Sequence, residues 1–179
     1  MRVLTKLLAK VAIQCDGGVT NVEQVASVSR LTPDEVACHV HDLVRLQRSA
    51  YAVEAELIGD DRIPPLTETA EELLSSGLTW HVLRMDGEIV AALALIEEDG
   101  LIDIDRLMVS PQRHRHGLAK TLIGSLPAGP AVVSTGRDNT PARRLYEALG
   151  FTHAEDQEVI PGLWVSSYRR RSSGLAPTH

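Results

Sequence analysis

The sequence predicts one α/β domain, in which helices flank a mixed sheet of six to seven strands. Apolar runs of strand length alternate along the chain with segments whose apolar residues recur at helical spacing. Two strands, 79–85 and 89–96, are joined by Asp86-Gly87, a strong signal for a tight hairpin. With 179 residues, of which 44% are hydrophobic, the chain is long enough to bury a sizeable core.

The N-terminal half predicts one strand and two helices. Residues 22–31 alternate roughly as a strand does. The run Thr32-Pro33-Asp34-Glu35 has the residues of a capping box with proline in the first turn, and the helix that it begins is expected to continue to Ile58. After a loop over 60–65, residues 67–74 predict a short helix with acidic residues near its start.

The stretch from Leu101 to Leu126 predicts a strand, a turn and a helix, and it is the centre of the functional argument. Leu101–Val109 is an apolar run of strand length, and Pro111 ends it because proline lacks an N–H. A basic turn with Gly117 follows and opens a helix near residue 114. Its glycine spacing matches neither common nucleotide-binding loop, but a helix start presents unpaired N–H groups that suit a phosphate.

The C-terminal part predicts a further strand, a helix and a hairpin. Residues 131–135 form an apolar strand, and the helix over 140–149 has Asn139 at its N-cap and Gly150 at its end. Two strands complete the sheet, at 151–160 and 163–168, with the turn at Pro161-Gly162.

Two motifs in this order resemble the GCN5-related N-acetyltransferase (GNAT) family. That family carries Arg/Gln-x-x-Gly-x-Gly/Ala directly after its fourth strand, and here His114, Gly117 and Ala119 stand in this register. The stretch from Asn139 to Phe151 is similar to the family's second segment, Asn…Ala…Leu-Tyr…Leu-Gly-Phe. His114 departs from the pattern, which matters little if main-chain amides bind the phosphates.

The resemblance implies a sheet whose two central parallel strands splay apart, with acetyl-coenzyme A entering between them. The pantetheine arm is then expected to pair with the backbone of the fourth strand, as an added strand does. The cofactor-binding residues that this implies are Leu107, Met108 and Val109 on the strand, His114, Arg115, His116, Gly117, Leu118, Ala119 and Lys120 around the pyrophosphate, and Asn139 and Tyr146 on the following helix.

The implied reaction is direct transfer of the acetyl group to an amine, without a covalent enzyme intermediate. Tyr146 matches the family's acid, which protonates the departing thiolate, and a backbone N–H near Met108 or Val109 would stabilise the oxyanion. Asp103 matches the glutamate base of some members and has Asp105 as a neighbour on the strand. Ser134 stands where other members carry a glutamate. The base therefore stays open, with Glu54, Glu56 and His153 as reserves.

The acceptor is expected to be a small-molecule amine or a peptide or protein amine, which the sequence does not distinguish. The resemblance assigns acceptor contacts to Tyr51 and Glu54, from the first helix, and to Arg137 after the fifth strand.

Composition narrows the classes of partner. A net charge of −6 argues against a general nucleic-acid binder, and no apolar run is long enough for a membrane span. Two cysteines suggest neither a metal site nor a disulfide framework, which fits the cytoplasm. We expect an N-terminal extension over 1–21, the acetyltransferase domain over 22–170 and a flexible tail over 171–179. A homodimer is compatible with the sequence.

Two alternatives remain. The chain could be an acyl-coenzyme A-binding module of the same fold that no longer transfers, as Ser134 and His114 suggest. Alternatively, residues 1–75 could form a winged-helix DNA-binding regulator with 34–48 as recognition helix, although only Arg45 and Arg48 are basic on the reading face.

Overall fold

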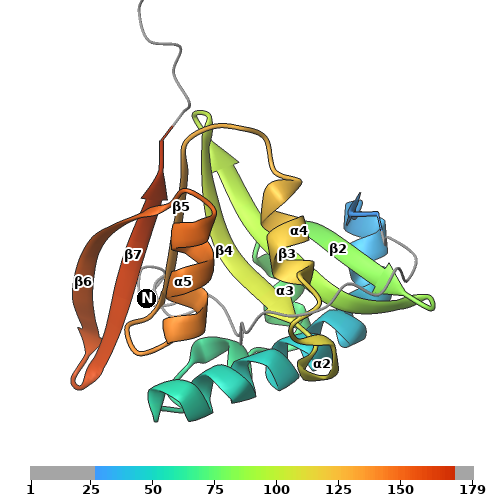
Figure 1. Cartoon of the computed structure of the whole chain (residues 1–179). Helices are drawn as coiled ribbons and strands as arrows, with labels where there is room; N and C mark the ends of the chain where they lie inside the picture. The colour runs from blue at the N-terminus through green and yellow to red at the C-terminus, as the bar shows by residue number, and fades with distance from the viewer. Residues whose placement is uncertain (1–26, 172–179) are drawn as a thin grey trace, which may run out of the picture.

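The computed structural model describes residues 27–171 and forms one seven-stranded sheet with helices on both faces (Figure 1). The elements in chain order are β1 (Ser29–Arg30), α2 (Pro33–Ile58), the 3₁₀ turn η1 (Pro64–Leu66), α3 (Ala70–Ser75), β2 (Thr79–Met85), β3 (Glu88–Glu98), β4 (Leu101–Val109), η2 (Pro111–Arg113), α4 (Leu118–Gly124), β5 (Ala131–Gly136), α5 (Thr140–Ala148), β6 (Thr152–Ile160) and β7 (Leu163–Arg170). The predicted extension and tail lie outside the described residues, except for Arg171.

The sheet is mixed, as the sequence predicted. Its strand order is β1-β2-β3-β4-β5-β7-β6, and β4 and β5 are parallel neighbours at the centre, whereas every other pair is antiparallel. Parallel strands need a crossover, and α4 supplies it between β4 and β5.

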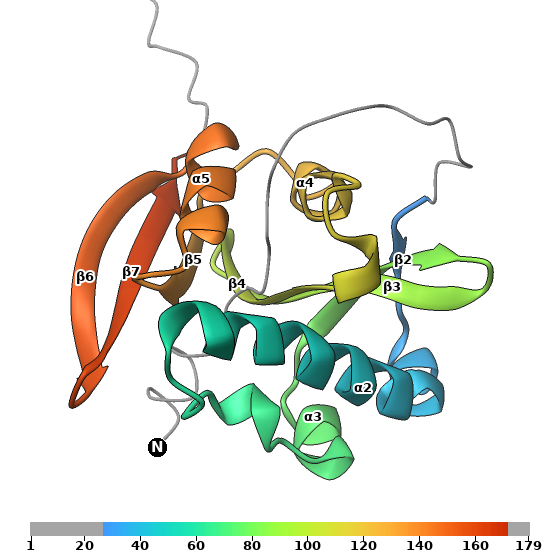
Figure 2. The same cartoon turned by 60° about the horizontal axis from the view of Figure 1, so that its bottom comes forward.

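Two apolar cores lie on the two faces of the sheet. Helices α2 and α3 cover one face and α4 and α5 the other, as Figure 2 shows. Within β4 the side chains alternate between the cores, because successive residues of a strand point to opposite faces: Leu107 and Val109 pack with α4 and α5, and Met108 packs with α2.

Local signals fixed the first helix accurately. Thr32 caps α2, its hydroxyl accepts from Glu35 N–H, and the Glu35 carboxylate accepts in return from Thr32 N–H at 2.8 Å, so the predicted capping box is present. Gly59 ends the helix with φ 68°, the left-handed conformation that glycine adopts most readily. The predicted end at Ile58 is confirmed.

Three predicted boundaries were wrong. The strand expected over 22–31 is only Ser29–Arg30 within the described residues, and 22–26 lie outside them. The helix expected over 67–74 begins at Ala70, because Thr69 forms a second capping box with Glu72. The helix expected from near residue 114 begins at Leu118, since Pro111–Arg113 form a 3₁₀ turn before it and Gly117 is its N-cap.

A buried charged network joins α2, the segment before α3 and the centre of β4. The Arg106 side chain is 3% exposed and bonds Glu68, with Nη2 2.8 Å from Oε1. Its Nη1 donates to Gln47 Oε1 at 2.6 Å, and Gln47 Nε2 donates to Glu68 Oε2 at 2.8 Å. The guanidinium is therefore paired and hydrogen-bonded, as a buried charge requires.

Candidate active site

The parallel strands β4 and β5 are paired over only three residues of each. Their register joins Ile102, Ile104 and the residue between them to 131–133, and β4 continues to Val109 while β5 continues to Gly136 without pairing to each other. The backbone of β4 beyond Ile104 is therefore an unpaired inner edge. The expected splay of the central strands is present.

A β-bulge decides which groups of β4 face this unpaired edge. Opposite β3, Ala94 pairs with Arg106 but Leu95 pairs with Ile104, so Asp105 is the extra residue of the bulge. Ile102 N–H bonds Pro130 on the β5 side, and Ser110 N–H bonds Val90 on the β3 side. The bulge thus changes which set of alternate residues has its backbone N–H and C=O groups directed toward β5.

This change affects the three residues of β4 that are predicted to bind the cofactor. Because Ser110 faces β3, the alternation places the N–H and C=O of Met108 toward β3 and those of Leu107 and Val109 toward β5. Leu107 therefore offers its N–H and C=O, and Val109 its N–H, to a ligand between the strands. Met108 contributes a buried side chain to the α2 core instead.

The turn after β4 presents N–H groups at the start of α4. The first intrahelical bond runs from Thr121 N–H to Gly117 C=O, which leaves the N–H groups of Leu118, Ala119 and Lys120 without helical acceptors. Gly117 has φ 72°, and Arg115 before it has φ 71°. Arg115, His116 and Lys120 are exposed, so cationic side chains surround the turn.

Ala119 explains the small residue at the end of the first motif. Its side chain is 5% exposed and packs into the core between α4 and the sheet. A small side chain there lets the first turn of α4 lie close to the strands.

His114 turns back onto β4. Its Nε2 lies 3.2 Å from the carbonyl oxygen of Val109, and burial lowers the pKa of its imidazole, although the contact with that carbonyl acts in the opposite direction. The side chain therefore ties the turn to the end of the strand rather than adding a positive charge. His116 Nδ1 lies 2.9 Å from the carbonyl oxygen of His114.

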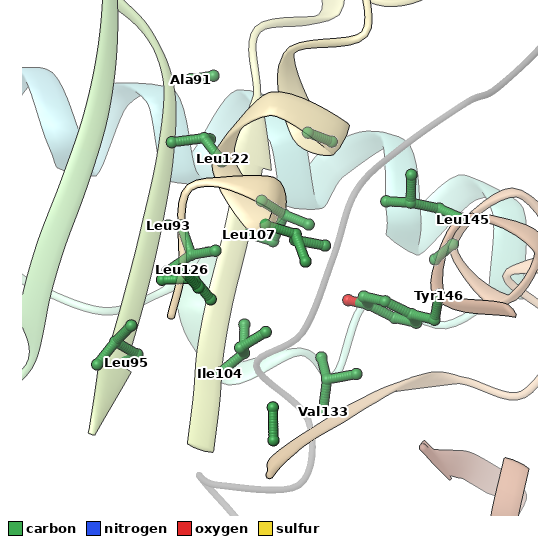
Figure 3. Close-up of a cluster of buried hydrophobic side chains, with 14 of the residues drawn as sticks. Ala91, Leu93, Leu95, Ile104, Leu107, Leu122, Leu126, Val133, Leu145 and Tyr146 are labelled. Atoms are coloured by element: carbon green, nitrogen blue, oxygen red, sulfur yellow. The ribbon is translucent and has the colours of Figure 1, made fainter. Parts of the chain in front are cut away.

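Tyr146 extends from α5 toward β4, as Figure 3 shows against Leu107 and Ile104. The ring is fully buried and packs against Phe151 and Tyr168, each with its centroid at 5.7 Å. Its hydroxyl has no hydrogen-bond partner among the described residues. Burial, with a smaller contribution from the charge of Glu54, raises the pKa of Tyr146 well above its ordinary value.

Glu54 is the second buried polar group at this place. Its Oε1 accepts from the Thr135 hydroxyl at 3.2 Å and from Gly136 N–H at 3.3 Å, and the side chain is 2% exposed. Burial raises the pKa of Glu54 to about 8, although hydrogen bonds from Asn139, Gly136 and Thr135 lower it. The other oxygen, Oε2, has no partner within residues 27–171.

Asn139 joins the two sides of this network. Its Oδ1 accepts from Ala142 N–H at 3.2 Å, which confirms the predicted N-cap of α5, and its side chain also hydrogen-bonds Glu54. Asn139 is fully buried. It therefore orders the start of α5 and positions Glu54.

The two aspartates considered as bases lie in different surroundings. Asp103 is half-buried on the paired section of β4, opposite Ile96 on β3 and Val132 on β5. Asp105 at the bulge is 7% exposed, and its Oδ2 accepts from Arg106 Nε at 3.1 Å. Asp103 therefore lies on the section of β4 that is paired with β5, whereas Asp105 lies just past it and is bonded to Arg106.

The predicted acceptor residues are only partly brought together. Tyr51 is fully buried in the core between α2 and the sheet. Arg137 is part-exposed beside the hairpin, where its guanidinium stacks on Trp164 at 4.9 Å. An open depression of about 520 Å³ lies at the end of α2, lined by Ala55, Glu56, Gly59, Asp60, Asp61 and Arg62.

The helical spacing in the sequence indicates that Glu54 is buried. The assignment of Glu54 as an acceptor contact did not take this signal into account. Glu54 follows Gln47, Ala50 and Tyr51 on the buried side of α2, so a carboxylate lies on the helix face that enters the core. Buried carboxylates need a partner or a raised pKa.

A family model described as an acetyltransferase (GNAT) domain matches residues 76–153, which include β4, the turn, α4, β5 and α5. Residues 76–153 thus match an acetyltransferase domain of the GNAT family. The two motifs and the parting of β4 and β5 lie within the matched residues and agree with that match.

Curated relatives are similar to part of this chain. YqkA of Bacillus subtilis, a UPF0157 protein, is 30% identical over 132 residues, which cover 71% of this chain and 38% of YqkA. N-acetylaspartate synthetase of Rattus norvegicus is 33% identical over 105 residues, which cover 52% of this chain and 35% of the synthetase. The chain therefore spans little more than a third of the length of these relatives.

Solved structures share the fold at low identity. The ribosomal-protein-S18-alanine N-acetyltransferase of Escherichia coli matches with a TM-score of 0.68 at 15% identity, covering 87% of this chain and 99% of that one. The PaiA N-acetyltransferase of Thermoplasma acidophilum, in complex with coenzyme A, matches with a TM-score of 0.60 at 17% identity, covering 79% and 98%.

Residues 27–171 contain neither a candidate metal cluster nor a candidate membrane-spanning helix. No group of three or more His, Cys, Asp or Glu side chains there could hold a metal ion. No helix in the same residues has the length and apolar character of a membrane-spanning segment.

Proposed function

We propose that the protein is an N-acetyltransferase, which transfers the acetyl group of acetyl-coenzyme A directly to a primary amine. The observation that carries the proposal is the unpaired inner edge of β4, which lies between the phosphate-suited turn and the buried hydroxyl of Tyr146. The coenzyme A in the similar PaiA structure and the names of two other matches, an N-acetyltransferase and an N-acetylaspartate synthetase, support it.

The residues present fit such an acyl donor. The N–H groups at the start of α4 and the exposed Arg115 and Lys120 suit a pyrophosphate, since both the amides and the cations favour an anion. The backbone groups of Leu107 and Val109 suit an amide-bearing pantetheine arm. His116, Gly117, Leu118 and Ala119 complete the turn.

The chemical task of the chain is then to stabilise charge and move two protons. The N–H of Leu107 or Val109 is suited to donate to the acyl oxygen as negative charge develops there. Tyr146 would donate its proton to the departing sulfur: its raised pKa keeps the phenol protonated at neutral pH, so it is available as an acid.

For the acceptor we propose an amine presented at the end of α2 and the β6–β7 hairpin. Arg62 Nη2 donates to the carbonyl oxygen of Pro161 at 3.2 Å, so these two segments meet. The names of two relatives suggest the first amines to test, L-aspartate and a peptide that begins with alanine. Arg137 beside the hairpin could bind a carboxylate of either acceptor.

The test is release of coenzyme A thiol from acetyl-coenzyme A with a panel of these two amines, a lysine-containing peptide and spermidine. We expect turnover that depends on one of the amines. Tyr146→Phe should lower kcat and leave the Kd for acetyl-coenzyme A nearly unchanged. Tight binding without thiol release from any amine would instead identify a non-catalytic acyl-coenzyme A-binding module.

A further inference from the structure

Two buried polar atoms of the described chain lack hydrogen-bond partners, and both lie where β4 and β5 part. They are Oε2 of Glu54 and the hydroxyl oxygen of Tyr146. An unsatisfied buried polar atom is costly, so each such atom calls for an explanation. Two of them at one place suggest a shared function.

The two side chains come from opposite layers of the protein. Glu54 belongs to α2, on one face of the sheet, and Tyr146 belongs to α5, on the other face. A continuous sheet would separate them. The charge of Glu54 nevertheless acts on Tyr146, because the sheet is interrupted between β4 and β5 at this point.

The carboxylate of Glu54 is held in one orientation. Thr135 and Gly136 donate to Oε1, and both belong to the section of β5 that has no β4 partner. Asn139 donates to the same side chain, and its own orientation is fixed because it caps α5. These contacts leave Oε2 as the oxygen available for a proton.

We propose that Glu54 is the proton acceptor of the transfer reaction and afterwards returns its proton to Tyr146. The inference rests on the proposed acetyl transfer. The amine nitrogen forms a bond to the acyl carbon, the carbon–sulfur bond breaks, and the nitrogen gives one proton to Oε2. Tyr146 gives its proton to the sulfur, and Glu54 then protonates the tyrosinate, so the enzyme ends unchanged.

The surroundings of Glu54 and Tyr146 determine the direction in which the proton moves between them. The other ionisable groups around Glu54 and Tyr146 are Tyr51 on α2 and Tyr168 on β7. Thr135, Gly136 and Asn139 are neutral, and no ion pair within residues 27–171 involves Glu54. Burial raises the pKa of Glu54 to about 8 and that of Tyr146 well above 10. Proton return from the carboxyl to the tyrosinate is therefore downhill.

The same geometry makes the sequence-predicted base, Asp103, the weaker choice. Asp103 lies on the section of β4 that is paired with β5, before the strands part. Asp105 accepts a hydrogen bond from the buried Arg106 and so belongs to a structural ion pair.

The experiment compares Glu54→Gln with the wild type and with Glu71→Gln, a control on the exposed side of α3. Rates are measured by thiol release with acetyl-coenzyme A and the panel amine that the wild type uses fastest, from about pH 6 to about pH 9. Glu54→Gln should lower kcat by about 100-fold with an unchanged KM for acetyl-coenzyme A. The amine's own ionisation affects all three proteins equally, so the lost dependence on pH near 8 reports Glu54.

Two further readouts separate catalysis from structure. In protein labelled with ¹³C at the glutamate carboxyls, one resonance should titrate near 8 and be missing in Glu54→Gln. The double variant with Tyr146→Phe should be no slower than the slower single variant, because both residues serve one proton circuit.

The outcomes of these experiments test the role of Glu54 separately from the proposed acetyl transfer. If the wild type turns over an amine but Glu54→Gln has the same kcat and pH profile, the inference is wrong and the acetyltransferase remains. An ordinary acidic titration of the Glu54 carboxyl also overturns it, whatever the rates. If the wild type transfers to no panel amine, the proposed function fails at its own test and this inference fails with it.

Discussion

A Cβ atom added to Gly136 would lie 2.7 Å from Cγ2 of Ile58, which is closer than a Cβ atom comes to another carbon in folded proteins. The absence of a side chain at the end of β5 therefore lets the last turn of α2 reach the strand. Through this contact Glu54 comes within hydrogen-bond distance of Gly136 N–H.

Gly136→Ala should destabilise the protein and displace Glu54. Because the clash is with a branched side chain on a packed helix, we expect a loss of about 1–3 kcal/mol in the free energy of unfolding, measured by urea denaturation. The double variant with Ile58→Ala removes the clashing atom and should recover most of the loss. A double variant less stable than Gly136→Ala would contradict this account.

Gly117→Glu should abolish binding of acetyl-coenzyme A, measured by calorimetry. The residue has φ 72° with open space around its Cα, so the variant places strain and a negative charge at the proposed pyrophosphate site without a steric clash. Gly87→Glu is the matched control, since Gly87 has φ 83° and open space in the β2–β3 hairpin, outside the turn that opens α4. Equal Kd values for the two variants would argue against the site.

Arg106→Met should cost about 3–5 kcal/mol of stability, because it leaves the carboxylate of Glu68 buried without its cation. Arg45→Met gives the comparison: Arg45 pairs with Asp42 at 2.8 Å, but its side chain is 74% exposed, so its loss should cost less than about 1 kcal/mol. Both values are measured by chemical denaturation. Similar costs would mean that the buried network contributes little.

Stability should fall as the pH rises from about 5 to about 8. The pKa of Glu54 is about 8 in the folded protein and near its ordinary value of 4.5 in the unfolded chain. In this window the folded protein keeps the proton and unfolding releases it, so this group lowers stability by up to ~1.4 kcal/mol per pH unit. The stability that the protonated Glu54 carboxyl contributes is therefore complete below the pKa of the unfolded chain and is lost above the pKa of the folded protein.

Glu54→Gln should remove this slope, and the difference between the two proteins is measured as Tm against pH. The glutamine stays neutral at every pH, like the protonated carboxyl that it replaces. A wild type and a variant with parallel curves would show that Glu54 titrates in the same way in both states.

Sequence patterns predicted elements whose signals are local. The capping residues at Thr32, the hairpin at Asp86-Gly87 and the N-cap at Asn139 all depend on neighbours within a few positions, and the structure confirms each of them. The late start of α4 was missed because the basic, glycine-bearing sequence before it is compatible with either a 3₁₀ turn or an α-helix. Only packing decides between the two.

The sequence alone also determined the order of the elements and the two motifs by which the chain resembles the GNAT family, since both are written in consecutive residues. Only the tertiary structure decided how the candidate site is assembled. The bulge at Asp105 turns the backbone groups of Leu107 and Val109, rather than those of Met108, toward β5, because the bulge depends on register against β3. Glu54 meets Gly136 across 82 positions of the chain, and its raised pKa comes from burial between layers that no local pattern specifies.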